Sequence, residues 1–252
     1  MKLAFWPGLG GGAGSFAEIT PVLAARGIDC LVIDPRYGRR SSWELEPLAE
    51  ELVDSDADVY AGHSWGAAIA ACAAVRRPPA ALVLLDGGYV SPPEFAQFGA
   101  KATLDERIAE IREEHAGYRW PSREAYLEYC RSMSPRWNGT IEECALEGMR
   151  YVDGEVLPPF DADELEAIVR GYEGFDAAET LAALSGDLPV LLVLATPQLE
   201  HVAPREALLR RFTELVPHGT IRNVESPHDV VWGLGPALGD IVADWLESEH
   251  LR

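Results

Sequence analysis

The stretch Gly62-His63-Ser64-Trp65-Gly66 decides how this sequence folds. A mostly apolar run, 58–61, precedes it, and an alanine-rich run, 67–74, follows it. This pattern predicts a strand, a sharp turn and a helix, with the serine on the turn and its hydroxyl exposed above the end of a sheet. Glycine at both ends of the motif leaves room where the helix crowds the neighbouring strands. We therefore interpret Ser64 as a nucleophile.

Length and charge restrict the class of protein. A chain of 252 residues can form one large α/β domain that carries a sizeable insertion. Its formal net charge of −20 opposes binding to nucleic acid or to anionic membrane surfaces. The chain opens without a charged and apolar leader, and it has no apolar run of about 18 residues. Its four cysteines lack the spacing of metal ligands, so we expect free thiols in a cytoplasmic protein.

Apolar segments along the chain predict a parallel sheet. Continuous apolar runs are typical of strands that helices cover on both faces. Helical segments separate most of these runs, and Ser15 with Glu18 predicts a capping box at the start of the first helix. We therefore expect an α/β fold with a doubly wound, mainly parallel sheet of about six strands. The expected strands are 2–6, 30–33, 58–61, 81–85, 188–194 and 219–224.

Residues 91–185 interrupt this alternation. They contain no convincing strand, and they carry a series of helix-start signals, with helices expected at 123–133 and 161–172. Aromatic residues are frequent in this segment. Because ligands bind outside the carboxyl ends of the strands in such sheets, an insertion there lies over the site. We predict a helical lid at 91–185, inserted in a core of residues 1–90 and 186–252.

The loop Pro7–Gly14, between the first strand and the first helix, has two interpretations. It could hold a phosphate as in dinucleotide-binding folds, with Asp34 after the second strand as the acidic partner. However, Gly8-x-Gly10-x-Gly12 does not match the spacing G-x-G-x-x-G. The serine motif downstream favours the second interpretation, in which backbone N–H groups of this loop stabilise an oxyanion.

A histidine that serves Ser64 must lie on a loop after a strand, at the carboxyl edge of the sheet. His228 follows the last expected strand, whereas His218 precedes that strand and so lies at the opposite edge. His63 lies inside the motif, where the direction of its side chain is not predictable. We therefore assign the general base to His228.

The order of these features resembles the α/β-hydrolase superfamily over nearly the whole chain. The matching stretches are Pro7-Gly8-Leu9-Gly10, Asp34–Ser41, the motif at 62–66 and Ser226-Pro227-His228. Pro7 stands where the family usually has His, and we expect the two leading strands common in the family to be missing. The resemblance implies an oxyanion hole made by the backbone N–H groups of Leu9 and Trp65.

The acid that orients His228 has two candidates. The family usually carries it after the penultimate strand, four residues before a proline, and Glu200 precedes Pro204 by that spacing. Asp86, at the end of the strand after the serine motif, is the rival, because some family members carry the acid there. We place Glu200 slightly ahead of Asp86.

The resemblance and the Ser64–His228 pair predict a serine hydrolase of the carboxylesterase type. We expect it to cleave an ester, lactone or thioester of a small, largely apolar substrate, without a metal or organic cofactor. The alternatives are a non-hydrolytic or C–C-bond-cleaving enzyme resembling hydroxynitrile lyase, and a non-catalytic ligand-binding protein. We expect a small-molecule substrate and neither nucleic acid nor membrane as a partner, while the oligomeric state stays open.

Overall fold

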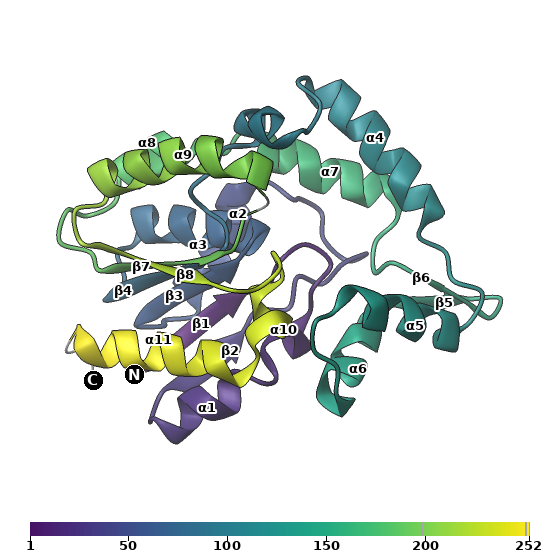
Figure 1. The fold of residues 1–252 in the computed structure, drawn as a ribbon, viewed down its shortest axis with the longest axis horizontal. Coiled ribbons are helices and arrows are strands. Elements are labelled where there is room, and N and C mark those ends of the chain that lie inside the picture. The colour runs from purple at the N-terminus through teal and green to yellow at the C-terminus, as the bar shows by residue number, and fades with distance from the viewer. Residues whose placement is uncertain (198, 250, 252) are drawn as a thin grey trace.

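A parallel sheet forms the centre of the computed structural model, which describes residues 1–197, 199–249 and 251. The six strands lie in the order β2-β1-β3-β4-β7-β8, and every neighbouring pair is parallel (Figure 1). This arrangement confirms the predicted doubly wound α/β sheet. The strands are β1 (Lys2–Trp6), β2 (Asp29–Val32), β3 (Val59–His63), β4 (Ala81–Leu85), β7 (Val190–Ala195) and β8 (Gly219–Val224).

Helices cover both faces of this sheet (Figure 1). In β4, Leu82 and Leu84 pack on one face, whereas Val83 and Leu85 pack on the other, since successive side chains point to opposite sides. Both sets are buried, which is why the central strands read as continuous apolar runs. The first face packs against α2 (Leu45–Asp54), α3 (Trp65–Arg76), α8 (Ala177–Ala182) and α9 (Val202–Leu215), and the second against α1 (Thr20–Ala25), α10 (Val230–Leu234) and α11 (Pro236–Ser248).

The start of the first helix differs from the prediction. Ser15 lies in a short 3-10 turn, Ala13–Phe16, and α1 begins only at Thr20. The carboxylate of Glu18 accepts hydrogen bonds from Arg136 and Asn138 instead of capping a helix. The predicted capping box is wrong because this carboxylate serves a contact between distant parts of the chain.

Residues 91–185, which we call the helical segment, contain a hairpin that the sequence analysis missed. Strands β5 (Arg150–Val152) and β6 (Glu155–Leu157) pair antiparallel around Asp153-Gly154. Both turn residues have positive φ, 51° and 86°, as a tight hairpin turn of this kind requires. The expectation of a strand-free segment is therefore wrong. The helices of the segment are α4 (Leu104–Gly117), α5 (Arg123–Met133), α6 (Gly139–Leu146), α7 (Ala162–Glu173) and α8.

The helical segment is fastened to the rest of the chain by polar contacts. Arg136 lies before α6 and makes a forked ion pair with Glu18, with distances of 3.0 and 3.1 Å. On α7, the carboxylate of Glu164 accepts the backbone N–H of Gly38 at 2.7 Å. Figure 1 shows α4 and α7 together on one side and α5, α6 and the hairpin on the other. The segment thus has two parts, each bound to a loop that follows a strand of the sheet.

Candidate active site

The motif at 62–66 forms the turn between β3 and α3. Ser64 has φ 53° and ψ −119°, a conformation that residues with a Cβ rarely adopt. A Cβ added to Gly62 would lie 2.0 Å from the carbonyl oxygen of Gly66, and one added to Gly66 would lie 2.3 Å from that of Trp6. Only glycine fits at these two positions, so the close approach of β1, β3 and α3 fixes the turn and holds Ser64 at the carboxyl end of β3.

Three side chains from separate strand ends meet at this turn. The Oγ of Ser64 lies 2.8 Å from Nε2 of His228, and Nδ1 of His228 lies 2.7 Å from Oδ2 of Asp86. Ser64 follows β3, Asp86 follows β4, and His228 lies on the loop between β8 and α10. With the Nδ1–H donating to Asp86, Nε2 is free to accept the proton of the serine hydroxyl.

The structure brings Asp86, and not Glu200, to His228. The side chain of Asp86 is 4% exposed, whereas Glu200 is exposed on a 3-10 turn that precedes α9. Among the described residues, no hydrogen bond joins Glu200 to His228. The preference for Glu200 is therefore corrected. The reason is the order of the strands. Because β4 lies next to β3, the carboxylate of Asp86, which follows β4, lies close to Ser64, whereas Glu200 lies beyond the end of β7.

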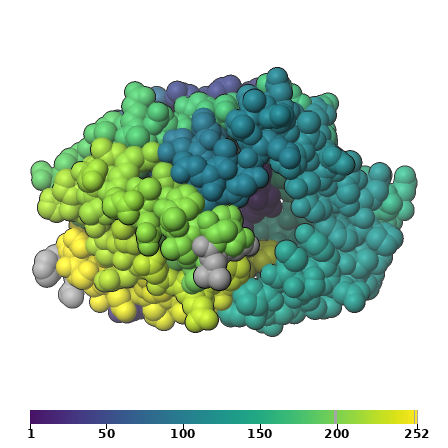
Figure 2. Space-filling model, turned by 45° about the horizontal axis from the view of Figure 1, so that its top comes forward, coloured from purple at the N-terminus to yellow at the C-terminus, as the bar shows by residue number. Residues whose placement is uncertain are grey.

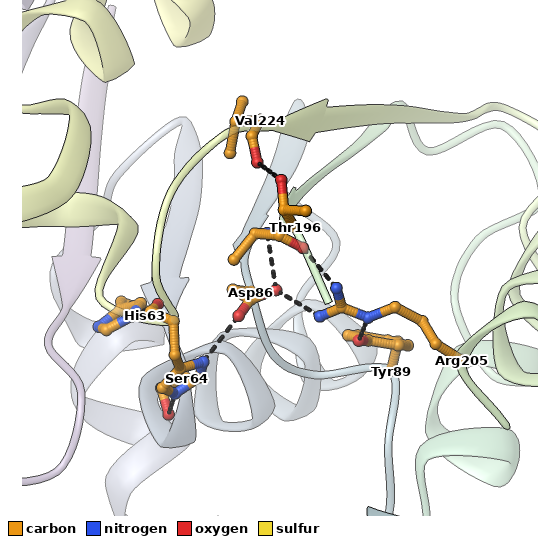
Figure 3. Close-up of polar contacts among 9 residues, drawn as sticks. His63, Ser64, Asp86, Tyr89, Thr196, Arg205 and Val224 are labelled. Carbon is orange, nitrogen blue, oxygen red and sulfur yellow. Dashed lines mark hydrogen bonds and ion pairs between the residues drawn. The ribbon is translucent and has the colours of Figure 1, made fainter. Parts of the chain in front are cut away.

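Asp86 is held from its other side as well. Its Oδ1 accepts the backbone N–H of Ala195 at 3.0 Å and the Nη2–H of Arg205 at 3.0 Å. Figure 3 shows Asp86 between Ser64 on one side and Arg205 on the other, with Tyr89 against the guanidinium. Arg205 was not predicted as a site residue, because nothing in the sequence separates it from the other arginines of α9. Its role becomes visible only when the strand ends are assembled.

The surroundings of His228 favour the protonated form of its imidazole more than bulk water would. The hydrogen bond to Asp86 raises the pKa of His228, and burial opposes that rise. The neighbouring carboxylate of Asp229 raises the same pKa further, and Arg205 lowers it. The Nε2 of His63 lies 3.0 Å from the backbone carbonyl of His228, and burial lowers the pKa of His63. A neutral His63 therefore donates to the loop that carries His228.

The residues expected to form the oxyanion hole lie beside Ser64. Leu9, Trp65 and Ser64 line the same cavity. Within the described part of the chain, neither the Leu9 nor the Trp65 backbone N–H donates a hydrogen bond. The Gly10 N–H, by contrast, donates to the hydroxyl of Tyr37 at 2.9 Å. The glycine loop thus leaves the N–H of Leu9, rather than that of Gly10, free for a ligand.

Asp34, the residue that a dinucleotide site would require, has another contact. Its Oδ1 accepts the backbone N–H of Arg36 at 2.8 Å, two residues along the chain. Arg36 has φ 55°, so this hydrogen bond stabilises a tight local turn after β2. The contact gives Asp34 a structural role in its own loop.

Two cavities meet at Ser64 and His228. The larger has a volume of about 690 Å³ and a mostly apolar wall, to which the helical segment contributes Phe95, Phe98, Ile111, Ile168, Val169 and Tyr172. The smaller, about 390 Å³, lies against the glycine loop and is also lined by Tyr126, Cys144 and Glu147. Figure 2 shows the molecule hollowed between the blue-teal surface of the helical segment and the green surface near residue 200, with the purple N-terminal part at the bottom.

Two other kinds of site, a membrane span and a metal centre, find no support in the described part of the chain. None of the helices in that part of the chain combines the length and apolarity needed to cross a membrane. No group of three or more His, Cys, Asp or Glu side chains is arranged there to hold a metal ion.

A parallel sheet with a serine on a strained turn after β3 and a histidine after the last strand defines the class of α/β-hydrolase folds. Residues 3–243 match the sequence pattern of the alpha/beta hydrolase family. The chain therefore belongs to this family, which confirms the resemblance drawn from its motifs. No curated protein sequence matches the chain.

Solved structures of hydrolases share the fold at low sequence identity. The thioesterase domain from the curacin biosynthetic pathway superposes with a TM-score of 0.73 at 16% identity, covering 96% of this chain and 90% of that domain. E-2-(acetamidomethylene)succinate hydrolase gives 0.72 at 17% identity, with 100% and 92% covered. A carboxylesterase structure from Nitrososphaera gargenis gives 0.69 at 14% identity, with 99% and 90% covered. These likenesses establish the fold.

Proposed function

We propose that this chain is a serine hydrolase that cleaves a carboxylic ester, or the related lactone or thioester, through an acyl-enzyme on Ser64. The observation that carries the proposal is the continuous chain from Ser64 Oγ to His228 Nε2, at 2.8 Å, and from His228 Nδ1 to Asp86, at 2.7 Å. Membership in the alpha/beta hydrolase family supports it. So does the likeness in fold to a thioesterase domain and a carboxylesterase.

In the proposed mechanism, Ser64 Oγ attacks the carbonyl carbon of the substrate while His228 Nε2 takes the hydroxyl proton. The backbone N–H groups of Leu9 and Trp65 stabilise the negative oxygen of the tetrahedral intermediate. His228 then gives its proton to the leaving alcohol or thiol, which leaves an acyl-enzyme. Water, deprotonated by His228, attacks this ester, and Ser64 departs with the proton returned from His228. Asp86 stabilises the imidazolium in both halves of the reaction.

The larger cavity supports an uncharged, mostly apolar substrate. The two arginines in its wall are each paired with a carboxylate: Arg107 with Glu173 at 2.5 Å, and Arg205 with Asp86 at 3.0 Å. A substrate carboxylate would have to compete for these cations. The formal net charge of −20 also repels anions at long range.

The proposal is tested by labelling and turnover. The protein is treated with a fluorophosphonate probe, the adduct is mapped by mass spectrometry, and hydrolysis of p-nitrophenyl esters from acetate to octanoate is measured. We expect the adduct on Ser64, and for Ser64→Ala a loss of turnover on the order of 10³-fold or more. Ser132→Ala, which removes an exposed serine hydroxyl on α5, is the matched control and should behave as the wild type.

Two results would contradict the proposal. One is a protein that is not labelled at Ser64 although it is folded and hydrolyses the esters. The other is turnover by Ser64→Ala at the wild-type rate. Either result would remove Ser64 from the reaction.

A further inference from the structure

We propose that Arg205 is a positioning residue of the reaction: it holds one oxygen of Asp86 so that the other oxygen stays on His228. The proposal rests on the proposed function, because it gives Arg205 a role only if Asp86 orients the base. Arg205 is the fourth residue of α9, and it reaches the Ser64–His228–Asp86 chain through Asp86. Its side chain is 13% exposed.

The guanidinium of Arg205 points its donors in three fixed directions, and a protein acceptor lies in each. Nη2 donates to Oδ1 of Asp86 at 3.0 Å, Nε donates to the hydroxyl of Tyr89 at 3.0 Å, and Nη1 donates to the carbonyl of Ala195. A planar fork of this kind matches several acceptors at once, as a lysine ammonium does not. Arg205 therefore ties α9 to the residues that follow β4 and to the end of β7.

Hydrogen bonds to both oxygens fix the plane of the Asp86 carboxylate. Oδ1 accepts from both Arg205 and the Ala195 N–H, and Oδ2 faces Nδ1 of His228 at 2.7 Å. A partial rotation about the Cβ–Cγ bond would break at least one charge-assisted hydrogen bond of a carboxylate whose side chain is only 4% exposed. Arg205 thus keeps the acceptor of His228 in place before and after the proton moves.

Arg205 also acts on His228 through its charge, and the two effects have opposite signs. The groups that face His228 are the carboxylates of Asp86 and Asp229, the guanidinium of Arg205 and the neutral ring of His63. Loss of the positive charge alone would raise the pKa of His228. Loss of the held carboxylate would lower it, since the hydrogen bond to Asp86 is the largest cause of its rise. The direction of the change therefore separates positioning from a simple charge effect.

The test compares Arg205→Met with Arg211→Met, an arginine on the same helix. Arg211 pairs with Glu94 at 2.5 Å and donates to the backbone carbonyl of Tyr89 at 3.0 Å, but it does not contact Asp86. For each variant we would measure kcat and KM with p-nitrophenyl esters, the rate of fluorophosphonate labelling against pH, and the melting temperature. Arg205→Lys and Tyr89→Phe, which keep charge or shape, remain informative if Arg205→Met fails to fold.

For Arg205→Met we expect kcat and the labelling rate to fall about 10- to 100-fold, because a displaced base loses alignment. KM should stay unchanged, and the acidic limb of the pH profile should move to lower pH. Arg205→Lys should recover part of the rate, and Tyr89→Phe should lose a smaller amount with the same sign. Arg211→Met should lose stability while keeping the wild-type kcat and pH profile.

Several outcomes would overturn the inference alone, with the wild type still labelled at Ser64. They are an Arg205→Met variant that matches Arg211→Met in kcat, an acidic limb that moves to higher pH, and a rise in KM with kcat unchanged. The last would make Arg205 a substrate-binding group. If the wild type itself is not labelled at Ser64, the proposed function fails, and the inference fails with it.

Discussion

The carboxyl edge of the sheet and the helical segment 91–185 surround the same cavity in different ways. At the edge, backbone turns that tolerate little change hold two of the polar groups, Ser64 and Asp86, both of which have positive φ. In the helical segment, apolar side chains that include those of α4 and α7 form the wall, and in the described part of the chain these wall residues are not among those with positive φ. A change at the edge should therefore affect the reaction of every substrate, whereas a change in the segment should affect which substrate is accepted.

The largest effect should come from exchanging the acid at the edge. Asp86→Asn keeps the shape of the side chain but favours the wrong tautomer of His228, so kcat should fall on the order of 10³–10⁴-fold for all esters. Glu200→Gln, the matched control beyond β7, should stay within about 2-fold of the wild type because its side chain is exposed. Steady-state kinetics with two esters measure both. Equal losses in the two variants would contradict the assignment of Asp86.

A change in the helical segment should alter selectivity instead. Ile111→Trp places a bulky ring in the larger cavity from α4. We expect kcat/KM for the octanoate ester to fall about 10-fold or more, with the acetate ester nearly unaffected, because a filled cavity excludes only the long chain. A chain-length series measures this. If acetate and octanoate lose activity in parallel, the residue acts on the chemistry and the contrast between the two regions fails.

A smaller effect concerns the pH profile. The hydrogen bond to Asp86 raises the pKa of His228, and only the unprotonated imidazole can take the serine proton. Activity should therefore decline as the pH falls through this raised pKa. In Asp86→Asn the anionic partner is lost, so the acidic limb of the residual activity should move to lower pH. Measuring kcat/KM against pH for both proteins tests the sign, and a limb that moves to higher pH would contradict it.

The smallest effect should come from the attachment of the helical segment. Arg136→Met removes a forked ion pair with Glu18, whose side chain is 14% exposed, and should lower the free energy of unfolding by about 1–3 kcal/mol. Urea denaturation measures this. Arg131→Met, which removes a more exposed pair with Glu142 inside the segment, should cost less than about 1 kcal/mol. A larger loss in Arg131→Met would reverse the expected ranking.

The strands and the serine turn at the carboxyl edge of the sheet were predicted better from the sequence than the structure of the helical segment, for physical reasons. The turn at Ser64 requires glycine on both sides, and a buried strand requires a continuous apolar run, so both leave local signals. The acid leaves none, since which carboxylate reaches His228 depends on the order of strands in the sheet. Glu200 had the expected spacing before Pro204, but β4 carries Asp86 closer to Ser64. Arg205 was missed for the same reason.

In the helical segment the missed hairpin did leave a signal. Asp153-Gly154 is a strong turn dipeptide, and apolar residues flank it at Val152 and Val156. The strands have only three residues each, too short to show an alternating pattern among the surrounding helices. Helix positions were easier, because side-chain caps such as Ser122 and Asp161 are local features of the sequence, and both cap the helices that begin after them.

The three residues of the active site come together over unequal lengths of chain. Ser64 and Asp86 stand on adjacent strands joined by one helix, whereas His228 reaches Ser64 across 164 positions of sequence. Contacts between distant positions close a long loop and form at a higher entropic cost than local ones. The unit of β3, α3 and β4 therefore brings Ser64 and Asp86 together at a lower entropic cost than the contact that adds His228. Turnover regained during refolding would therefore report the formation of this long-range contact.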